Sequence, residues 1–353
     1  MIYFDNAATA IKRKEILEYI VENKEVFDGN PDSIHAMGRE AKKILEESRA
    51  KIARAIGANP KNVIFTSGAT EANNTVISAF RDGEIITTAI EHDSILNTID
   101  RSRAVLISAG LDGRVSLDDV KNKISEQTKL VSIMFINNET GAIQPVKEIG
   151  EYLADKDIWF HVDAVQAFGH MDIDVAEIFC DSLSLSGHKI GGINGFGILF
   201  ARKDLPSFMK GGEQEKERRA GTSFVAGAYS MAESIEKTRD ERAHIGDLKA
   251  YFIEKLQSSK LNYEINGSVD KSSAHIINIY LPDFKSDFLL TYLDMNGICV
   301  SAGSACRAGS FLPSHVITNM YDKARAEHSV RFSFGYQNTK EEIDQAIEVL
   351  ERL

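Results

Sequence analysis

The stretch Ser182-Leu183-Ser184-Leu185-Ser186-Gly187-His188-Lys189 begins as a short β-rich run. It ends in three groups that can take part in chemistry: a hydroxyl, an imidazole and an amine. A lysine at the edge of a sheet, among apolar and polar neighbours, can lose its proton and form a Schiff base with an aldehyde. A lone lysine beside a flexible loop is more often only a solvated side chain. The segments around this stretch therefore have to show which interpretation holds.

Short β-rich runs of the same kind recur along the first two thirds of the chain, separated by longer helical patterns. They cover residues 62–66, 84–88, 130–136 and 159–162. Residues 30–55 are typical of the helical pattern, because Pro31 follows the expected start and apolar residues keep helical spacing among charged ones. This alternation predicts βαβ units, and hence an α/β fold with a mostly parallel central sheet and helices on both faces.

The pattern changes after about Thr222. A long charged helix is expected over residues 229–258, followed by a strand over residues 275–281 and further helices, which together predict a smaller α+β domain. The length of 353 residues fits two domains. We expect a large domain over residues 13–235, and a small domain made of residues 1–12 and 236–353.

Composition and motifs argue against several classes of protein. The 41 basic residues stand against 52 acidic ones, and the formal charge of -11 argues against direct binding of nucleic acid or of a membrane surface. Three cysteines without a CxxC pair fit a reduced, cytoplasmic chain without a zinc site, and we expect neither a signal peptide nor a membrane span. The dinucleotide-binding, Walker A, zincin and nucleophile-elbow motifs are all absent from the sequence.

A carboxylate follows the β-rich run at residues 159–162, in the stretch His161-Val162-Asp163-Ala164-Val165-Gln166. Pyridoxal phosphate needs such a carboxylate to keep its ring nitrogen protonated, so that the ring accepts electrons from a substrate carbanion. Gln166 is placed to hydrogen-bond the ring hydroxyl. The alternative interpretation of Asp163 is a helix N-cap.

A third polar cluster, Phe65-Thr66-Ser67-Gly68-Ala69-Thr70-Glu71-Ala72-Asn73-Asn74, runs from a strand through a glycine turn into the start of a helix. Backbone N–H groups and the Thr70 hydroxyl there predict a phosphate site, which the helix dipole favours. The alternative is that Ser67 or Thr70 only caps the helix, with Glu71 in its first turn.

With these clusters the chain resembles the cysteine desulfurases, pyridoxal-phosphate enzymes of fold type I in the class V aminotransferase group. The matching stretches follow the family order through nearly the whole chain: residues 3–9 (YFDNAAT), Asn30-Pro31, His35, Gly38-Arg39, 65–74 (FTSGATEANN), Glu91-His92, 137–146 (NNETGAIQPV), 161–169 (HVDAVQAFG), 184–192 (SLSGHKIGG), 211–222 (GGEQEKERRAGT), 301–306 (SAGSAC) and 331–335 (RFSFG).

The resemblance implies a role for each residue singled out above. Lys189 would bind the cofactor covalently, Asp163 would pair with the ring nitrogen, and Gln166 would contact the ring hydroxyl. Thr222 would reach the phosphate of the neighbouring subunit, which implies a homodimer. The phosphate of the chain's own site would be held by Ala69, Thr70, Ser186 and His188.

Three further assignments come mainly from the resemblance. His92 would stack on the cofactor ring and handle protons, which suits a flat imidazole that titrates near neutral pH. Asn138 would lie against the ring and the substrate, and Arg331 would bind the substrate carboxylate through its bidentate guanidinium. Without the resemblance, we would interpret His92 as a polar surface or turn residue and Arg331 as a surface residue that forms an ion pair.

Cys306 lies in a run of small residues from Ser301 to Ser310, which we expect to form a mobile, exposed loop in which Arg307 favours the thiolate. Cys180 and Cys299 have apolar neighbours, and we expect them to be core residues. The resemblance implies that Cys306 attacks the sulfur of L-cysteine, holds it as a persulfide, and passes it to an acceptor protein after L-alanine is released.

Several alternatives stay open. A selenocysteine lyase or another class V aminotransferase-type enzyme would share this site, and a cofactor-free sulfur-relay or scaffold protein would share only the fold. The chain ends at Leu353 soon after the last expected helix, and we expect no tail that docks a scaffold protein. The acceptor therefore stays open between an iron–sulfur scaffold, a tRNA-thiolating enzyme and another sulfur relay.

Overall fold

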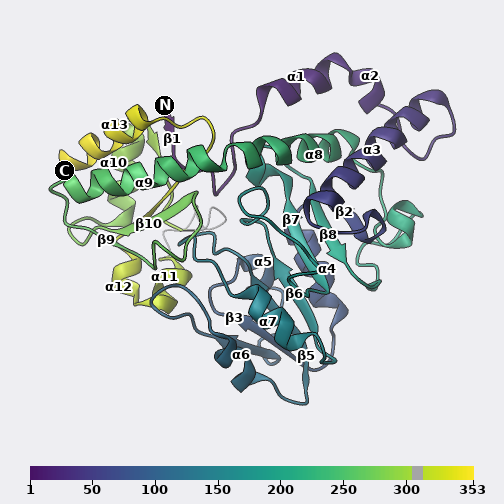
Figure 1. The fold of residues 1–353 in the computed structure, drawn as a ribbon, viewed down its shortest axis with the longest axis horizontal. Coiled ribbons are helices and arrows are strands. Elements are labelled where there is room, and N and C mark those ends of the chain that lie inside the picture. Colours follow the sequence, from purple (N-terminus) through teal and green to yellow (C-terminus); the bar gives the residue numbers. More distant parts are fainter. Residues whose placement is uncertain (304–312) are drawn as a thin grey trace.

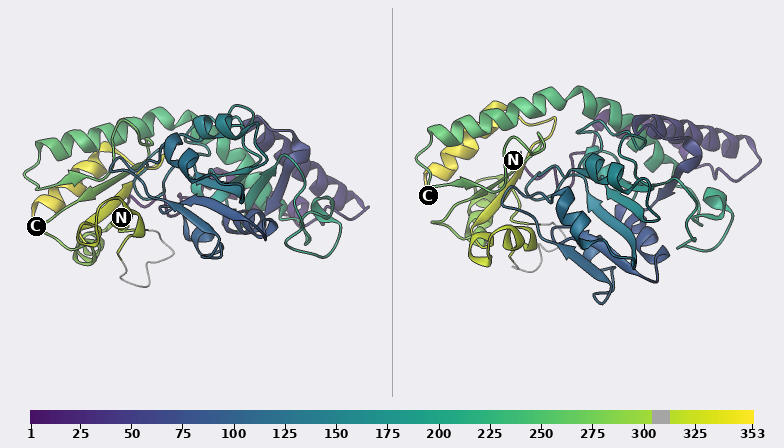
Figure 2. Two further views of the ribbon diagram at one scale, coloured as in Figure 1. Left: turned by 90° about the horizontal axis from the view of Figure 1, so that it is seen from below. Right: turned by 60° about the horizontal axis from the view of Figure 1, so that its bottom comes forward.

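The computed structural model describes residues 1–303 and 313–353 (Figure 1). A larger part contains a seven-stranded sheet, and a smaller part contains two short sheets. Both ends of the chain lie in the smaller part (Figures 1 and 2). Among the described residues, no helix is both long and apolar enough to cross a bilayer.

The large sheet has the strand order β2-β8-β7-β6-β5-β3-β4. The pairs from β7 through β6, β5 and β3 to β4 are parallel, whereas β8 is antiparallel to both of its neighbours. Most strand residues are buried, as expected for short apolar runs covered on two faces. The bounds are β2 Val63–Thr66, β3 Glu84–Thr88, β4 Ala104–Ile107, β5 Thr128–Met134, β6 Trp159–Asp163, β7 Ser182–Ser186 and β8 Gly197–Ala201.

Helices cover both faces of this sheet, which confirms the predicted fold class. Apolar residues of α4 and α5 pack on one face, and those of α3, α6, α7 and α8 pack on the other. The bounds are α1 Lys14–Glu22, α2 Lys24–Phe27, α3 Ala36–Ala55, α4 Ala69–Ala79, α5 Asp93–Leu96, α6 Leu117–Lys123, α7 Val146–Leu153 and α8 Val225–Asp240, with short 3-10 turns at Pro60–Asn62, Gly187–Ile190 and Gln214–Glu217.

The smaller part has its own buried cluster, formed by an antiparallel sheet β12-β10-β9, a parallel pair β1–β11 and the helices around them. The bounds are β1 Ile2–Tyr3, α9 Arg242–Ser258, β9 Glu264–Ile265, β10 Ile276–Tyr280, α10 Ser286–Met295, β11 Ile298–Cys299, α11 His315–Met320, α12 Lys323–Ala326, β12 Ser329–Ser333 and α13 Lys340–Glu351.

The buried residues change from one cluster to the other between Ile235 and Ile245. Strand β1 packs with the second cluster, because it pairs with β11. On this basis we propose that the domains are residues 13–235, and residues 1–12 together with 236–353.

The first predicted helix is shorter than expected. Helix α3 begins at Ala36, so residues 30–35 lie outside it. The side chain of Asn30 accepts the backbone N–H of Asp32 at 3.0 Å, and His35 caps the helix by accepting the N–H of Gly38 at 3.3 Å. These local side-chain bonds compete with helix formation and set its start.

The expected helix over residues 229–258 is wrong as a single element, because the structure divides it at Glu241. The carboxylate of Glu241 accepts two hydrogen bonds from Arg13, each 2.7 Å long. Neither glycine nor proline marks the break, and the residue at the break contacts one that lies 228 positions away in the sequence. A helical pattern carries no information about such a distant contact.

Candidate active site

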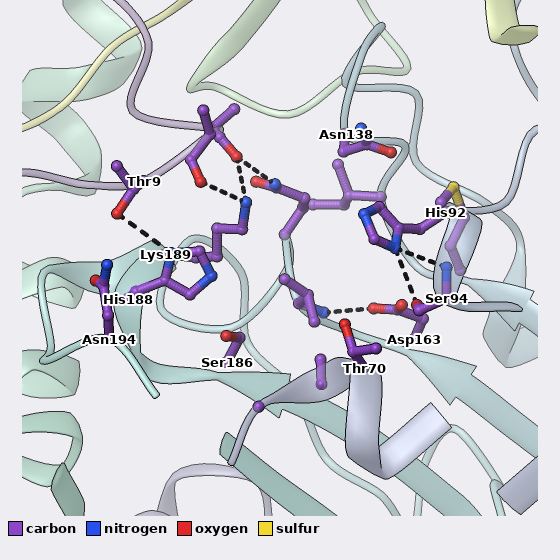
Figure 3. Close-up of a pocket in the computed structure, with 18 of the residues that line it drawn as sticks. Thr9, Thr70, His92, Ser94, Asn138, Asp163, Ser186, His188, Lys189 and Asn194 are labelled. Carbon is purple, nitrogen blue, oxygen red and sulfur yellow. Dashed lines mark hydrogen bonds between the residues drawn. The ribbon is translucent and has the colours of Figure 1, made fainter. Parts of the chain in front are cut away.

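A cavity of about 550 Å³ opens where β6 and β7 end, and residues from both parts of the chain line it (Figure 3). Open α/β sheets bind ligands at the carboxyl ends of their strands. The residues predicted from the sequence that line this cavity are Ala69, Thr70, His92, Asn138, Asp163, Gln166, Ser186, His188, Lys189 and Arg331.

Lys189 lies in the 3-10 turn that follows β7. The turn ends at Gly191, whose φ of +86° strongly favours glycine. The Lys189 amine donates to the carbonyl oxygens of Ala7 and Ala8, both at 2.7 Å (Figure 3). Backbone carbonyls of the N-terminal segment thus hold a primary amine at the wall of the cavity.

Asp163 is the last residue of β6, so a buried strand carries its carboxylate to the cavity. Its Oδ2 accepts the side-chain amide of Asn73 at 2.8 Å, and its Oδ1 accepts the backbone N–H of Val165 at 3.1 Å. The N-cap interpretation is wrong, because the chain after Asp163 forms turns rather than a helix before it enters β7.

The amide of Gln166 has a fixed orientation. Its Nε2 donates to the carbonyl of Ala7 at 3.0 Å, and its Oε1 accepts from Nε2 of His275 at 3.2 Å. The ring of His275 stacks on His170 with 3.7 Å between centroids, and burial keeps the pKa of His275 well below its usual range. The second amide hydrogen of Gln166 can therefore serve a ligand in the cavity.

The predicted phosphate cradle lies at the N-terminus of α4. Gly68 occupies the cap position and no side chain caps the helix, so the capping interpretation of Ser67 and Thr70 is wrong. The N–H groups of the first turn, including that of Ala69, have no acceptor within the helix and lie at the positive end of its dipole. A Cβ on Gly197 would come within 2.5 Å of the Gly68 Cα, so the close approach of this turn to β8 requires glycine.

Ser186 and His188 contribute to the cavity from the end of β7. The Thr9 hydroxyl accepts the Lys12 amine at 3.1 Å and is hydrogen-bonded to Nδ1 of His188 at 3.2 Å. The other ring nitrogen of His188, Nε2, can serve a ligand in the cavity. Burial, with Lys189 and Lys12 nearby, lowers the pKa of His188 to about 3 and keeps the ring neutral.

His92 caps the short helix α5, because its Nδ1 accepts the backbone N–H of Ser94 at 3.1 Å. A ring nitrogen that accepts a hydrogen bond carries no proton, so the proton of the neutral ring is on Nε2. Figure 3 shows Asn138 and His92 on the same side of the cavity, away from His188.

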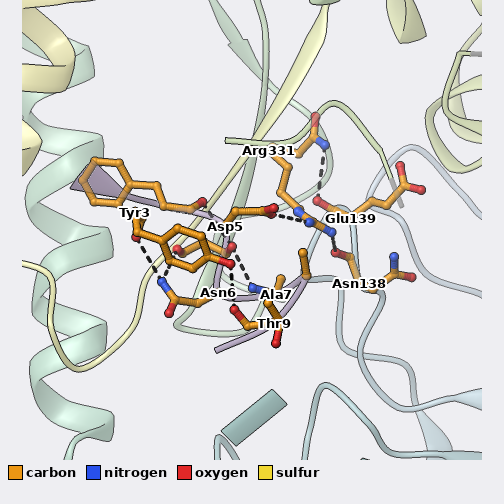
Figure 4. A network of polar contacts seen from close by, with 12 residues as sticks. Tyr3, Asp5, Asn6, Ala7, Thr9, Asn138, Glu139 and Arg331 are labelled. Carbon is orange, nitrogen blue, oxygen red and sulfur yellow. Dashed lines mark hydrogen bonds and ion pairs between the residues drawn. The ribbon is translucent and has the colours of Figure 1, made fainter. Parts of the chain in front are cut away.

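Arg331 lies in β12, and its side chain is only 1% exposed, so the interpretation as a surface residue is wrong. Its Nη1 donates to the carbonyl of Asn138 at 2.7 Å, and its Nη2 pairs with Asp5 at 2.7 Å (Figure 4). Arg331 also lines the cavity. A guanidinium in the wall of a cavity suits an anionic ligand.

Two predicted residues lie elsewhere. Thr222 is exposed and lines a separate cavity of about 120 Å³. Cys306 lies outside the described residues. Among the described cysteines, burial raises the pKa of Cys180 to about 12 and also raises that of Cys299, and neither suits a thiolate nucleophile.

Several groups that hold the site residues in place were not predicted from the sequence. Asn73 lies three residues after Thr70, so helical spacing placed it on the same side of α4, and this was the available signal. No local signal marks His275, because its partner Gln166 is 109 positions away. The missed groups are Asn73, Ser94, His161, His275 and the carbonyls of Ala7 and Ala8.

The groups that meet in this cavity fit pyridoxal phosphate: an amine for its aldehyde, a helix N-terminus for its phosphate, a carboxylate for its ring nitrogen and an amide for its ring hydroxyl. In the described part of the chain, no cluster of His, Cys, Asp and Glu could hold a metal ion. The fold and the site define a pyridoxal-phosphate enzyme of fold type I.

Comparisons with known proteins agree with this class. Residues 2–346 match the class V aminotransferase family. A protein of Bacillus subtilis strain 168 named putative cysteine desulfurase IscS 1 is 43% identical to this chain, covering 98% of the chain and 96% of the relative. The solved structure of a NifS-like protein from Rickettsia africae ESF-5 has a TM-score of 0.91 at 32% identity and covers 100% of this chain and 99% of that one.

A further solved structure, of SspA in complex with cysteine, has a TM-score of 0.84 at 31% identity, covering 96% of this chain and 100% of that one. The chain belongs to the class V aminotransferase family and, within it, to the cysteine desulfurases, which are pyridoxal-phosphate enzymes. The names of these relatives do not favour a selenocysteine lyase or another enzyme of the group.

Proposed function

We propose that this enzyme converts L-cysteine to L-alanine and transfers the sulfur to Cys306, from which an acceptor protein takes it. The observation that carries the proposal is that Lys189, Asp163 and Arg331 line one cavity, where they supply a reactive amine, a partner for the ring nitrogen and a site for a carboxylate. The names of the relatives and the cysteine complex of SspA support L-cysteine as the substrate.

Bound pyridoxal phosphate provides an electron sink that stabilises negative charge at the Cα of an amino acid. We assign the aldehyde of the cofactor to Lys189, its ring nitrogen to Asp163, its ring hydroxyl to Gln166 and its ring face to His92. The phosphate is assigned to the residues at the start of α4 and the end of β7, namely Ala69, Thr70, Ser186 and His188.

Arg331 and Asn138 position the substrate. The guanidinium of Arg331, which lines the cavity, is assigned to the carboxylate of L-cysteine. Asp5 and the Asn138 carbonyl hold the plane of the guanidinium from the other side. His92, whose neutral ring carries its proton on Nε2, is assigned to handle protons of the bound substrate.

The sulfur transfer needs no added oxidant or reductant. The Cys306 thiolate attacks the substrate sulfur, and the new S–S bond replaces the C–S bond of L-cysteine. The electron pair of the C–S bond stays with the carbon, which takes up a proton to give the methyl group of L-alanine. Cys306 then carries a persulfide that an acceptor thiol can take.

The finer features are part of the same proposal. We assign the enzyme to the cytoplasm, which the three cysteines without a CxxC pair support. The charge of -11 supports the absence of direct contact with nucleic acid or a membrane. We propose a homodimer in which the exposed Thr222 reaches the phosphate in the partner subunit. The acceptor would be an iron–sulfur scaffold or a tRNA-thiolating enzyme.

The test is intact-protein mass spectrometry after addition of pyridoxal phosphate and L-cysteine, with L-alanine measured in the same sample. We expect a mass increase of about 32 Da, one sulfur atom, that maps to Cys306 and is accompanied by L-alanine. Cys306→Ser should lose both products and still retain the cofactor on Lys189, as measured by reduction with borohydride and peptide mapping.

Cys299→Ser is the matched control, since it makes the same substitution at the partly exposed cysteine of β11. This variant should form the sulfur adduct and L-alanine at the parent rate. Undiminished L-alanine release by Cys306→Ser would refute the assignment of Cys306. A keto acid in place of L-alanine would favour a transaminase.

A further inference from the structure

A line of buried hydrogen bonds leads from Asp163 away from the cavity, through α4 and back along β6 to the start of β7. Its inner members are Asn73, His161 and Ser182, each with 0% exposure. Trp159, at the start of β6, ends the line. None of these four residues lines the cavity, so the line is a support behind the site.

The donors and acceptors in this line follow from its Asp163 end. The Asp163 carboxylate accepts the amide nitrogen of Asn73 at 2.8 Å, so Oδ1 of Asn73 faces His161 and accepts from its Nε2 at 3.0 Å. Nδ1 of the neutral His161 ring then accepts the Ser182 hydroxyl at 2.9 Å, and that hydroxyl accepts the indole N–H of Trp159 at 2.8 Å.

Burial strengthens this assignment, because it lowers the pKa of His161 to about 3 and keeps the ring neutral. A neutral imidazole has one donor and one acceptor, so fixing one nitrogen fixes the other. The amide oxygen of Asn73 consequently faces His161, and the amide nitrogen faces the site.

The amide nitrogen of Asn73 gives its two hydrogens to two different groups of the site. One goes to Oδ2 of Asp163 at 2.8 Å and the other to the hydroxyl of Ser94 at 2.9 Å. The Ser94 hydroxyl, having accepted this bond, donates to Nδ1 of His92 at 2.9 Å. A single amide thus supports the Asp163 carboxylate and, through the Ser94 hydroxyl, adds a second donor to Nδ1 of His92, which already accepts the backbone N–H of Ser94.

We propose that Asn73 is a positioning residue that couples Asp163 to His92, and that the residues behind it on β6 and β7 fix the orientation of its amide. The inference rests on the proposed function, in which Asp163 contacts the ring nitrogen of the cofactor and His92 its face. Asp163 and His92 already have fixed orientations before the cofactor binds, which lowers the entropic cost of ordering them on binding.

Asn73→Asp tests the proposal, because it keeps the shape of the side chain and removes both N–H donors. The new carboxylate lies against Asp163, and two adjacent carboxylates raise one carboxyl pKa so that the pair holds a proton as the pH falls. We expect affinity for pyridoxal phosphate, titrated into the cofactor-free protein, to fall at least about tenfold near pH 8 and to recover partly near pH 6.

Asn74→Asp is the matched control. Asn74 is the next residue of α4, and its amide donates to the backbone carbonyl of Ser94 at 3.1 Å. We expect its cofactor affinity to stay within about twofold of the parent at every pH, since the affected bond does not reach Asp163. An equal, pH-independent loss in both variants would show a structural role and overturn the proposal.

Nuclear magnetic resonance of the cofactor-free protein labelled with ¹⁵N-histidine gives a readout that does not depend on the reaction. The parent should show His161 and His92 as neutral rings protonated on Nε2. Asn73→Asp should shift the His92 signals, because the Ser94 hydroxyl then donates to the new carboxylate. Unchanged His92 signals, or unchanged cofactor affinity, would overturn the coupling.

Should Asn73→Asp not fold, Ser182→Ala tests the same line from its far end. It removes one hydroxyl from β7 and leaves Nδ1 of His161 without its donor. We expect shifted His161 signals and a loss of cofactor affinity of about two- to fivefold, and a parent-like affinity would refute the role of the line. A positive result here with no persulfide on Cys306 would reject the proposed reaction and leave this inference standing.

Discussion

Glu91 places a completely buried carboxyl group between the ends of two strands next to the site. Its Oε1 accepts the hydroxyl of Thr88 at 2.8 Å from the end of β3, and the N–H of Met134 at 2.9 Å from the end of β5. Burial raises the pKa of Glu91 to about 8. The carboxyl group therefore joins the strand ends that carry His92 and part of the cavity wall without bearing a charge at neutral pH.

The raised pKa of Glu91 predicts how stability depends on pH. The folded state keeps the proton up to about pH 8, whereas the unfolded chain releases it near 4.5, so the parent loses stability as pH rises between these values. Glu91→Gln keeps the accepting oxygen and does not titrate. Chemical denaturation should show that the free energy of unfolding of the variant increases relative to that of the parent as the pH rises, by a few kcal/mol at most.

An exposed glutamate of α7, Glu148, provides the control for this experiment. Glu148→Gln should follow the parent at every pH, because an exposed carboxyl group has nearly the same surroundings in the folded and unfolded states. Parallel pH profiles for Glu91→Gln and the parent would show that the burial of Glu91 has no such effect.

Five strands of the large sheet were predictable from the sequence because their apolar runs are short and end in polar clusters, whereas β4 and β8 were not predicted. The runs at residues 84–88 and 182–186 coincide with β3 and β7. The run at residues 130–136 is displaced by two residues from β5, because Ile136 leaves the ladder and forms an isolated bridge with Ile143. Apolar character marks burial, and it does not mark where strand pairing ends.

The site was predictable to the extent that its groups directly follow such strands, as Lys189 and Asp163 do. The carbonyl of Ala7 could not be predicted, because it receives hydrogen bonds from both Lys189 and Gln166 through its backbone, and any residue type carries a carbonyl. The same holds for contacts between the two parts of the chain, which depend on how the elements pack.

The junction of α8 and α9 offers a test of such a packing contact. Arg13, whose side chain is 4% exposed, pairs through both Nη atoms with Glu241 and stacks on Tyr336 at 4.4 Å from the ring centroid. Glu241→Gln leaves a buried guanidinium without its counter-charge. We expect urea denaturation to show a loss of about 1.5–3 kcal/mol.

A more exposed ion pair between α1 and α8 serves as the control. Glu15 pairs with Lys237 at 2.8 Å, and both side chains are largely exposed. Glu15→Gln should change stability by less than about 1 kcal/mol, because water already solvates both charges. Similar losses in the two variants would show that burial of Arg13 does not determine the strength of the junction.

The whole chain exposes large apolar side chains on the segments around Thr222 and near α1 and α3. Ile34 is 91% exposed, Met37 47% and Phe224 45%. Large exposed apolar side chains are common at association sites. Together with the exposure of Thr222, they support the proposed homodimer, in which each site takes one residue from the other subunit.

Shared sites predict that two defective subunits can restore one intact site. Thr222→Val alone should weaken cofactor affinity about tenfold, because the phosphate loses a hydrogen bond. Lys189→Ala subunits lack the cofactor amine but keep Thr222. In a dimer of one Thr222→Val subunit and one Lys189→Ala subunit, the site that retains Lys189 receives an intact Thr222 from the partner subunit, so L-alanine formation at limiting pyridoxal phosphate should recover.

The control is a dimer of one Thr222→Val subunit and one subunit with both substitutions, Lys189→Ala and Thr222→Val, which should show no recovery. Equal activity of the two purified mixed dimers, which carry different affinity tags on their subunits, would mean that Thr222 acts within its own subunit or not at all.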